Sequence, residues 1–268
     1  MSETKQDLIS IVTPSYNAEK LIGRTIESVQ AQSYKNWELI VVDDCSADGT
    51  VAVVEKYAEK DTRIRLVKLD KNHGAPAAPR NIGVRAASGE WVALLDADDI
   101  WHPRKLEFQM DALQVSGAVF CSSQMLDFVD DEKVYFANPE DVKIETISFS
   151  KQLRKFRTPT SSVVLKRGLL RDFPFNEDPR YKAREDLECW LKIHEEIGSS
   201  IKLLFPFLHY RIVQGQISGS KLKMALKTQL VLSEYVLASG QSLGWRAYFF
   251  SLTHILYSVY FRLIRRSL

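Results

Sequence analysis

The sequence predicts an α/β fold in which a mostly parallel sheet is flanked by helices. Short runs rich in Ile, Val and Leu alternate with longer amphipathic segments. Several of the short runs end in Pro, Asp or Gly, as expected where a buried strand reaches the edge of a sheet. The 268 residues, 45% of them hydrophobic, are enough to bury a large core.

The first half of the chain repeats this alternation most regularly. Residues 23–33 carry apolar side chains at helical spacing with Ile22, Ile26 and Val29, and residues 103–116 begin a helix at Pro103. Residues 46–60 and 75–89 are predicted helices as well. Between these segments the apolar runs predict strands at residues 8–16, 37–44, 63–69 and 90–96.

The second half is less regular. We expect a strand at residues 118–129, a strand followed by a helix start within 158–170, and a helix over 183–198. Pro206 is expected to close a strand that begins at Ile201. Two helices should follow, at residues 220–238 and 244–264. The predicted organisation is one α/β domain over residues 1–218, with halves at about 8–115 and 116–218, and a helical extension over 219–268.

The charge distribution bears on the partners of the chain. A net charge of +2 argues against a general nucleic-acid binder, so we expect no nucleic-acid partner. Residues 207–268, however, hold eight Lys or Arg and one acid, which leaves the remainder at −5. A basic tail on an acidic body indicates docking on an anionic membrane surface; the alternative is a helical face that happens to be basic.

The cysteines and the first residues predict a compartment. Cys45, Cys121 and Cys189 are far apart and form no CxxC motif, which fits a reducing environment. The first ten residues, "MSETKQDLIS", are polar and lack the apolar core of a signal peptide. We therefore expect a cytoplasmic protein.

Acidic side chains gather where ligands bind in folds of this kind. In a parallel sheet, ligands bind at the carboxyl ends of the strands. That rule places on one rim Tyr16, Asp43, Asp44, Asp96, Asp98 and Asp99. Pro14 and Ala97, in the same two segments, are further candidates for binding the donor. Three carboxylates within "LLDADD" favour a hard divalent cation, Mg²⁺ or Mn²⁺, shared with phosphates. The alternative is a polar loop with solvated acids, or helix caps before Pro103.

A cation with few protein ligands favours a nucleoside diphosphate as its partner. Asp43 and Asp44 are positioned to accept hydrogen bonds from a base or a ribose, although Ser46 and Asp48 favour helix capping in the same segment. Tyr16 is positioned to stack on a base. Arg80 either neutralises phosphate or pairs with Asp44, a surface salt bridge being the alternative.

Glu185 and Asp186 could have either a structural or a catalytic role. Glu185 and Asp186 begin a predicted helix, where paired acids often only complement the helix dipole. One of the two carboxylates is also suited to deprotonating a hydroxyl nucleophile. His73 is expected to be an ordinary loop residue.

Three stretches together resemble the inverting family 2 glycosyltransferases with the GT-A fold, a Rossmann-like α/β fold, of the type that builds bacterial polysaccharide or lipopolysaccharide. They are "SIVTPSYNAEKLIGRTIESVQAQSYKNWELIVVDDCSADGT", "GAPAAPRNIGVRAASGEWVALLDADDIWHPRKLE" and "REDLECWLKI". The resemblance covers residues 8–115 strongly and 158–220 moderately. It implies a nucleotide-binding first half and an acceptor-binding second half.

The resemblance also implies residue roles at the nucleotide. Tyr16 and Asp44 match the contacts to base and ribose, and Arg80 matches an arginine that helps to hold the nucleotide. Asp96 and Asp98 match the DxD motif, which binds the metal and the diphosphate, with Asp99 beside it.

For catalysis the resemblance implies a base in the Glu185–Asp186 pair, and Asp186 is our choice. The base deprotonates an acceptor hydroxyl, which attacks the anomeric carbon opposite the leaving nucleotide and inverts its configuration. The implied donor is a nucleotide-sugar, with UDP as the favoured carrier, and the implied acceptor is a glycan or a lipid-linked saccharide.

One position departs from the family pattern. Relatives often read YRxHxxSxS where this chain has "YRIVQGQIS", so that Val213 replaces the histidine that reaches metal or phosphate. Ser218 and Lys221 remain, and Arg211 is a candidate for phosphate contact. His209 is close in sequence, but its side chain should face another way. An inactive sugar-binding member is therefore an alternative reading, as is an aspartate-based phosphatase or phosphotransferase using "LLDADD".

An apolar run near residue 250 bears on whether the protein associates with a membrane. Residues 247–261 form a run of 15 residues without Asp, Glu, Lys or Arg, whereas a membrane span needs ~20 apolar residues. We expect an interfacial helix on the inner face of the cell membrane, the alternative being a helix packed on the body or in a dimer. A lipid-linked acceptor would fit the first arrangement.

Overall fold

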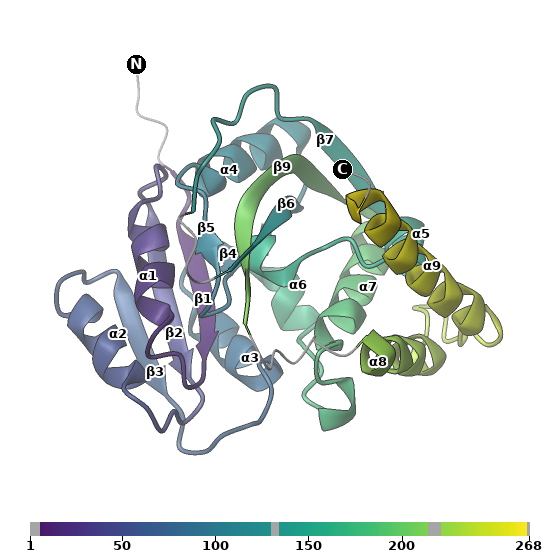
Figure 1. Ribbon diagram of the computed structural model, residues 1–268, viewed down its shortest axis with the longest axis horizontal. Helices are drawn as coiled ribbons and strands as arrows, with labels where there is room; N and C mark the ends of the chain where they lie inside the picture. Colours follow the sequence, from purple (N-terminus) through teal and green to yellow (C-terminus); the bar gives the residue numbers. More distant parts are fainter. Residues whose placement is uncertain (1–5, 130–133, 214–220, 267–268) are drawn as a thin grey trace.

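The computed structural model describes residues 6–129, 134–213 and 221–266. Within these residues one mixed sheet forms the centre of the molecule, with helices on both faces (Figure 1). Its strands follow the order β3-β2-β1-β4-β8-β6-β9-β5, and β7 pairs with β9 beside this path. The predicted α/β class is confirmed.

The first half contains the predicted parallel βαβ units. Strand β1 (Ile9–Ser15) pairs with β2 (Trp37–Asp43) and β4 (Trp91–Leu94), and β2 pairs with β3 (Ile64–Lys68), all in parallel. The connecting helices are α1 (Ile22–Gln30), α2 (Thr50–Ala58) and α3 (Ala77–Ala86).

The two faces of these strands are buried against different helices. Because successive side chains of a strand point to opposite faces, Ile9 and Ile11 lie in one apolar cluster and Val12 lies in another. The first cluster joins the sheet to α1, α2 and α4 (Lys105–Ser116), and the second joins it to α3, α6 (Arg167–Asp172) and α7 (Glu185–Ile197). Burial on both sides explains why the strands read as continuous apolar runs.

The second half adds antiparallel pairs. Strand β8 (Val164–Lys166) runs antiparallel to both β4 and β6 (Phe120–Val129). Short strands that the sequence analysis did not predict complete the sheet: β5 (Ile100–Trp101) and β7 (Ile144–Ser148), both antiparallel to β9. The structure also contains α5 (Phe149–Arg154) and two short 3₁₀ turns, at Thr160–Ser162 and Pro179–Tyr181.

The expectation that Pro206 closes a strand is wrong. Strand β9 extends from Ser199 through Pro206 to Ile212. Its pairing with β6 shifts register between Ser123 and Met125, where Pro206 lies opposite Gln124. Proline has no N–H to donate, so it is tolerated where the ladder is already irregular.

The last two helices pack on the body of the protein. Helices α8 (Lys221–Glu234) and α9 (Arg246–Arg266) lie beside α5 and α7 (Figure 1), sharing an apolar cluster that includes Leu153, Leu187, Leu232 and Ala247. No helix in the described ranges has both the length and the hydropathy that a bilayer span requires.

Candidate functional site

A cavity of about 1260 Å³ opens at the carboxyl ends of the parallel strands. Segments from both halves of the chain line it. One end is formed by the turns after β1 and β2, the middle by the loop after β4 and the start of α7, and the other end by the segment after α5 together with β9. The volume exceeds the roughly 300–1,000 Å³ that is usual for one small ligand.

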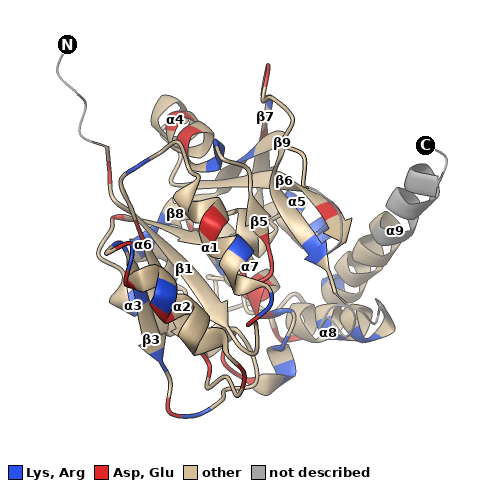
Figure 2. Cartoon of the chain, turned by 60° about the vertical axis from the view of Figure 1, so that its left-hand side comes forward, with Lys and Arg blue, Asp and Glu red and all other residues tan. Residues whose placement is uncertain are grey.

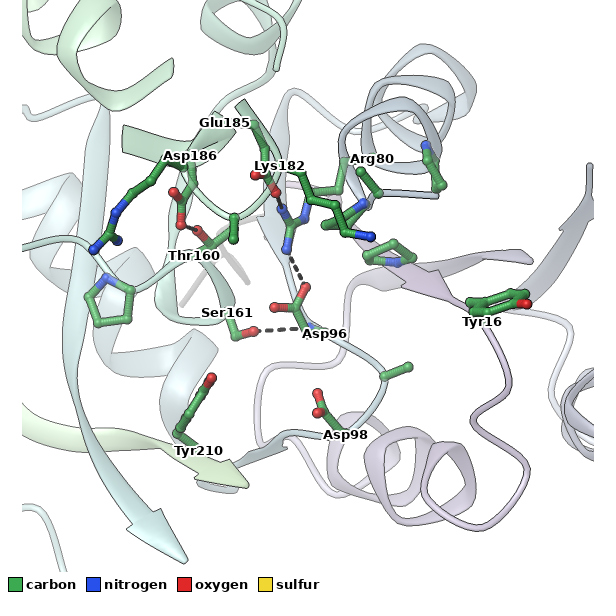
Figure 3. A pocket seen from close by; sticks show the side chains of 18 of the residues that line it. Tyr16, Arg80, Asp96, Asp98, Thr160, Ser161, Lys182, Glu185, Asp186 and Tyr210 are labelled. Atoms are coloured by element: carbon green, nitrogen blue, oxygen red, sulfur yellow. Dashed lines mark hydrogen bonds and ion pairs between the residues drawn. The ribbon is translucent and has the colours of Figure 1, made fainter. Parts of the chain in front are cut away.

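The first end of the cavity contains Pro14, Tyr16 and Asp44. Tyr16 is 53% exposed and presents its ring at the edge of the site (Figure 3). Asp44 is held by His73, whose backbone N–H lies 3.0 Å from both carboxylate oxygens and whose Nδ1 lies 2.8 Å from Oδ1. His73 lies in a loop, as predicted, but it also fixes the carboxylate of Asp44.

Asp43 differs from Asp44 in its surroundings. Its two carboxylate oxygens accept hydrogen bonds from the Ser46 backbone N–H at 2.9 Å and from the Ser46 hydroxyl at 2.5 Å. Asp43 is 2% exposed and is not among the residues that line the cavity. The structure therefore gives Asp43 a role in the turn after β2, while Asp44 faces the ligand space.

Arg80 and Asp96 form the centre of the site. The Arg80 guanidinium donates to Asp96 at 2.6 Å and to Glu185 at 3.2 Å (Figure 3). The expected alternative of an Arg80–Asp44 pair is wrong, because both Nη atoms of this 4% exposed arginine are directed to the other two carboxylates. The Asp96 backbone N–H donates to Ser161 Oγ at 3.0 Å, which fixes the loop after β4.

The carboxylate of Asp98 lies close to the like charge of Asp96 in this loop. Its carboxylate is half-buried and lines the cavity together with that of Asp96 and with Ala97. Burial, followed by repulsion from Asp96, raises the pKa of Asp98 to about 6. A bound cation would relieve this repulsion.

Asp99 and Arg211 lie behind the loop rather than in the cavity. Asp99 is fully buried, and its Oδ1 accepts from the Arg211 backbone N–H at 3.0 Å. Burial, followed by repulsion from Asp98 and Asp96, raises the pKa of Asp99 well above its usual range. Arg211 donates through Nε to the Asp98 carbonyl at 2.7 Å. Both residues, expected at ligand or metal, are placed to hold the loop backbone instead.

The acid pair on α7 is arranged asymmetrically. Glu185 is 3% exposed and accepts from Arg80, whereas Asp186 accepts from the Thr160 hydroxyl at 3.1 Å and from the Leu187 N–H at 2.7 Å. Burial raises the pKa of both carboxyls, and repulsion from Asp186 adds to the shift of Glu185. Both residues line the cavity.

The segment after β9 is only partly described. Val213 lines the cavity where the family pattern has histidine. Ser218 and the side chain of Lys221, the first residue of α8, lie outside the described part of the structure. His209 is 3% exposed and packs edge-on against Phe136 at 5.0 Å between ring centroids, so it faces away from the cavity as expected.

Several cavity residues were not predicted from the sequence. Thr160 and Ser161 contact the acids from the 3₁₀ turn, and Lys182 and Tyr210 extend into the central space (Figure 3). Lys155, Arg157 and Lys202 line the second end. Lys202, Leu208 and Tyr210 of β9 all line the cavity. The alternation of side chains along a strand could have predicted this shared face, but the register of β9 shifts near Pro206 and breaks the alternation.

No group of three or more His, Cys, Asp or Glu side chains with metal-site geometry occurs among the described residues. The expected three-carboxylate cluster is therefore not formed, because Asp99 is directed away from Asp96 and Asp98. What the cavity offers a cation is the Asp98 carboxylate and, beside it, the Arg80-bound carboxylate of Asp96. Mg²⁺ and Mn²⁺ are often held by one or two carboxylates together with substrate phosphates, and this smaller set fits that arrangement.

Comparisons with known proteins agree with this architecture. The family model described as glycosyl transferase family 2 matches residues 10–177. An Escherichia coli protein, UDP-Glc:alpha-D-GlcNAc-diphosphoundecaprenol beta-1,3-glucosyltransferase WfgD, is 35% identical over 232 residues, covering 85% of this chain and 87% of that protein.

Two solved structures share the fold. The S. aureus TarS 1-349 complex with UDP-GlcNAc aligns with a TM-score of 0.67 and 22% identity over 84% of this chain, which spans 65% of that chain. The mannosyltransferase PcManGT of Pyrobaculum calidifontis, in complex with GDP-Man and Mn²⁺, aligns with a TM-score of 0.59 and 22% identity, covering 86% of this chain and 63% of that one. The predicted GT-A fold is confirmed.

Proposed function

The chain belongs to glycosyl transferase family 2, and from this premise we propose that it moves a sugar from a nucleoside-diphosphate donor to a hydroxyl of a lipid-linked glycan during bacterial surface-polysaccharide synthesis. Family membership makes the chain a glycosyltransferase and removes the basis of the phosphatase alternative. The donor, the metal, the acceptor and the residue roles are the parts we propose.

The observation that carries the proposal is the order of groups along one cavity. Tyr16 and Asp44 lie at the first end of the cavity, Asp96 and Asp98 follow at the loop after β4, and Glu185 and Asp186 lie beyond them. A nucleotide-sugar laid along this line would present its base, its diphosphate and its sugar to these groups in turn. We favour a UDP-sugar because the relative WfgD is named for UDP-Glc.

Asp98, with Asp96, would hold a divalent cation at the donor diphosphate. Such a cation supplies positive charge that stabilises the developing negative charge on the leaving group. Arg80 orients Asp96 through their ion pair. Arg211 donates a hydrogen bond to the Asp98 carbonyl and thereby stabilises the conformation of the loop.

We assign Asp186 as the base. Its burial-raised pKa brings the carboxylate closer to the range in which it accepts a proton effectively near neutral pH. The Asp186 oxygens accept hydrogen bonds from neutral donors, whereas Glu185 is paired with the Arg80 guanidinium, whose positive charge makes that carboxylate a weaker base. The Asp186 carboxylate takes the proton of the acceptor hydroxyl as that oxygen bonds to the anomeric carbon. The bond from that carbon to the diphosphate oxygen breaks on the opposite side, and the configuration inverts.

The lipid-linked acceptor follows from two observations. WfgD is named for an acceptor joined to diphosphoundecaprenol. In this chain α9 leaves exposed a row of apolar side chains that includes Phe249, Leu252 and Leu256. We propose that this face rests on the inner surface of the cell membrane, where such an acceptor would be held.

A panel of nucleotide-sugars tests the proposal. The full chain with Mn²⁺ should release free nucleoside diphosphate slowly from one donor, and that donor should raise the melting temperature. Chelation should remove both effects. Absence of any release or thermal shift across UDP-, dTDP- and GDP-sugars would contradict the assignment.

A further inference from the structure

The second end of the cavity carries an excess of positive charge that the donor site does not use. Lys155 and Arg157, after α5, and Lys202, on β9, all line this end. They come from segments far apart in sequence, brought together because the Lys202 ammonium donates to the Arg157 carbonyl at 2.6 Å.

Among the described residues, one carboxylate pairs with part of this charge. Glu145 on β7 accepts from Arg157 at 3.1 Å and from Lys151 at 3.2 Å. Within the described ranges, Lys151 and Arg157 are thus paired with the same carboxylate, and Figure 2 shows basic residues on the neighbouring α5. Burial, with a smaller effect of the positive charge of Arg157, lowers the pKa of Lys155 and of Lys202 to about 8, while Glu145 acts in the opposite direction.

Arg157 also has donor capacity that the described residues leave unused. Its Nη1 is directed to Glu145, but its buried Nε has no hydrogen-bond partner in the described part of the chain. An arginine beside lysines, with a free N–H, is suited to phosphate oxygens.

The apolar face of α9 adjoins this cluster. The Thr253 hydroxyl donates to the Arg154 carbonyl at 2.8 Å, and the Lys155 ammonium lies 5.3 Å from the centroid of the Tyr257 ring. On the same helix Leu252 and Leu256 are exposed. A cationic subsite beside an exposed apolar helix matches a molecule with a phosphate head and a hydrocarbon chain.

We propose that Lys155, Arg157 and Lys202 form a subsite for the phosphate or diphosphate group of the acceptor substrate. The inference rests on the proposed function, in which Asp186 takes the proton of the acceptor hydroxyl, so that the rest of the acceptor extends from Asp186 toward this end of the cavity. It assigns to the acceptor a second set of anion contacts, separate from those of the donor.

The test is binding of farnesyl diphosphate to the full chain saturated with UDP and Mn²⁺, which fill the donor site. Arg157→Gln and Lys202→Gln should each weaken binding about 10- to 100-fold, since each removes charge-assisted hydrogen bonds. Lys202→Arg should restore most of the affinity. Lys60→Gln, which removes an exposed lysine that follows α2 and does not line the cavity, is the matched control.

Inorganic diphosphate is the second arm. Equal affinity for it, lost in the same variants, assigns the subsite to soluble phosphates, whereas tighter binding of farnesyl diphosphate assigns it to a prenyl-linked acceptor. Wild-type affinity in folded Arg157→Gln and Lys202→Gln overturns the proposal. If Lys202→Gln does not fold, Lys155→Gln carries the same expectation.

Failure of the proposed function would look different. Release of nucleoside diphosphate from donor in the absence of acceptor depends on the first end of the cavity, so its absence from the wild type would count against the proposed reaction and not against the subsite. A protein that binds farnesyl diphosphate through Lys202 but processes no nucleotide-sugar would keep the subsite and lose the proposed reaction.

Discussion

At the residue scale, Asp98 is subject to two demands that change in opposite directions with pH. Burial and the charge of Asp96 favour its protonated form, while metal binding requires the carboxylate. Because its pKa is raised to about 6 from a usual value of about 4, the folded metal-free protein holds this proton more tightly than the unfolded chain. The contribution of Asp98 to stability is therefore lost as pH rises from about 4 to about 6.

The first prediction concerns this residue. Asp98→Asn should reduce Mn²⁺-dependent UDP affinity about 100-fold or more, because loss of an outer-shell partner alone costs about 10- to 100-fold at metal sites. In the wild type the same affinity should rise as pH increases through about 6. Calorimetric titration of UDP with and without Mn²⁺ measures both. Asp70→Asn, an exposed loop acid, is the control; unchanged affinity in Asp98→Asn would reject the metal assignment.

The second prediction separates the two acids of α7. Asp186→Asn should preserve donor binding and slow transfer by about 10²–10⁴-fold, the usual contribution of a general base. Glu185→Gln should instead weaken donor binding, because it removes a partner of buried Arg80. Single-turnover transfer and donor titration on both variants make the comparison. Normal transfer by Asp186→Asn would move the role to Glu185.

At the scale of elements, the contact of α3 with the sheet positions Arg80. Gly83 lies so close to β1 that a Cβ there would overlap Val12 Cγ1 and would lie 3.2 Å from Val42 Cγ2. Only a residue without a side chain lets the helix approach this closely. The same approach brings Arg80 to Asp96 at the end of β4.

The third prediction follows from this contact. Gly83→Ala should destabilise the protein by about 1–3 kcal/mol, the usual cost of overpacking a core, and should also weaken donor binding by displacing Arg80. Thermal melting and UDP titration measure the two effects. Gly168→Ala, in α6, adds a methyl group with nothing within 4 Å and should be neutral or slightly stabilising. Equal melting temperatures for both variants would show that α3 tolerates a larger spacing.

At the scale of the whole molecule, α9 has two faces. Ala247 and Ser251 are buried against the body, while Phe249, Leu252 and Leu256 are exposed. Packing on the body and contact with a membrane were alternatives in the sequence, but in three dimensions they involve different sides of one helix. Deleting the helix would disrupt its buried contacts too, so substitution of the exposed side is the cleaner test.

The fourth prediction uses that exposed side. Leu252→Gln with Leu256→Gln should reduce binding to phosphatidylglycerol vesicles about tenfold per residue, since each substitution removes an apolar side chain from the interface, while melting is unchanged. Val115→Gln, at an 88% exposed position on α4, is the matched control. Cosedimentation with vesicles measures the effect. Equal sedimentation of the double variant and the control would reject the membrane-facing role.

The sequence by itself determined the α/β class and most of the elements of the first half. Runs such as that of residues 37–44 are buried on both faces, and this produces a continuous apolar signal that needs no knowledge of distant partners. The rim position of Tyr16, Asp44, Asp96 and Asp98 followed from the rule for parallel strands, and all four line the cavity.

Tertiary structure decided what each of these side chains contacts. The pairing of Arg80 with Asp96 and Glu185, the turn role of Asp43 and the burial of Asp99 depend on how α3, α7 and β9 meet around one loop. The cationic end of the cavity depends on the meeting of β9 with the segment after α5, which brings Lys202 to Arg157. Local pattern cannot show such pairs, because their members come from segments that only the folded sheet and its helices bring into contact.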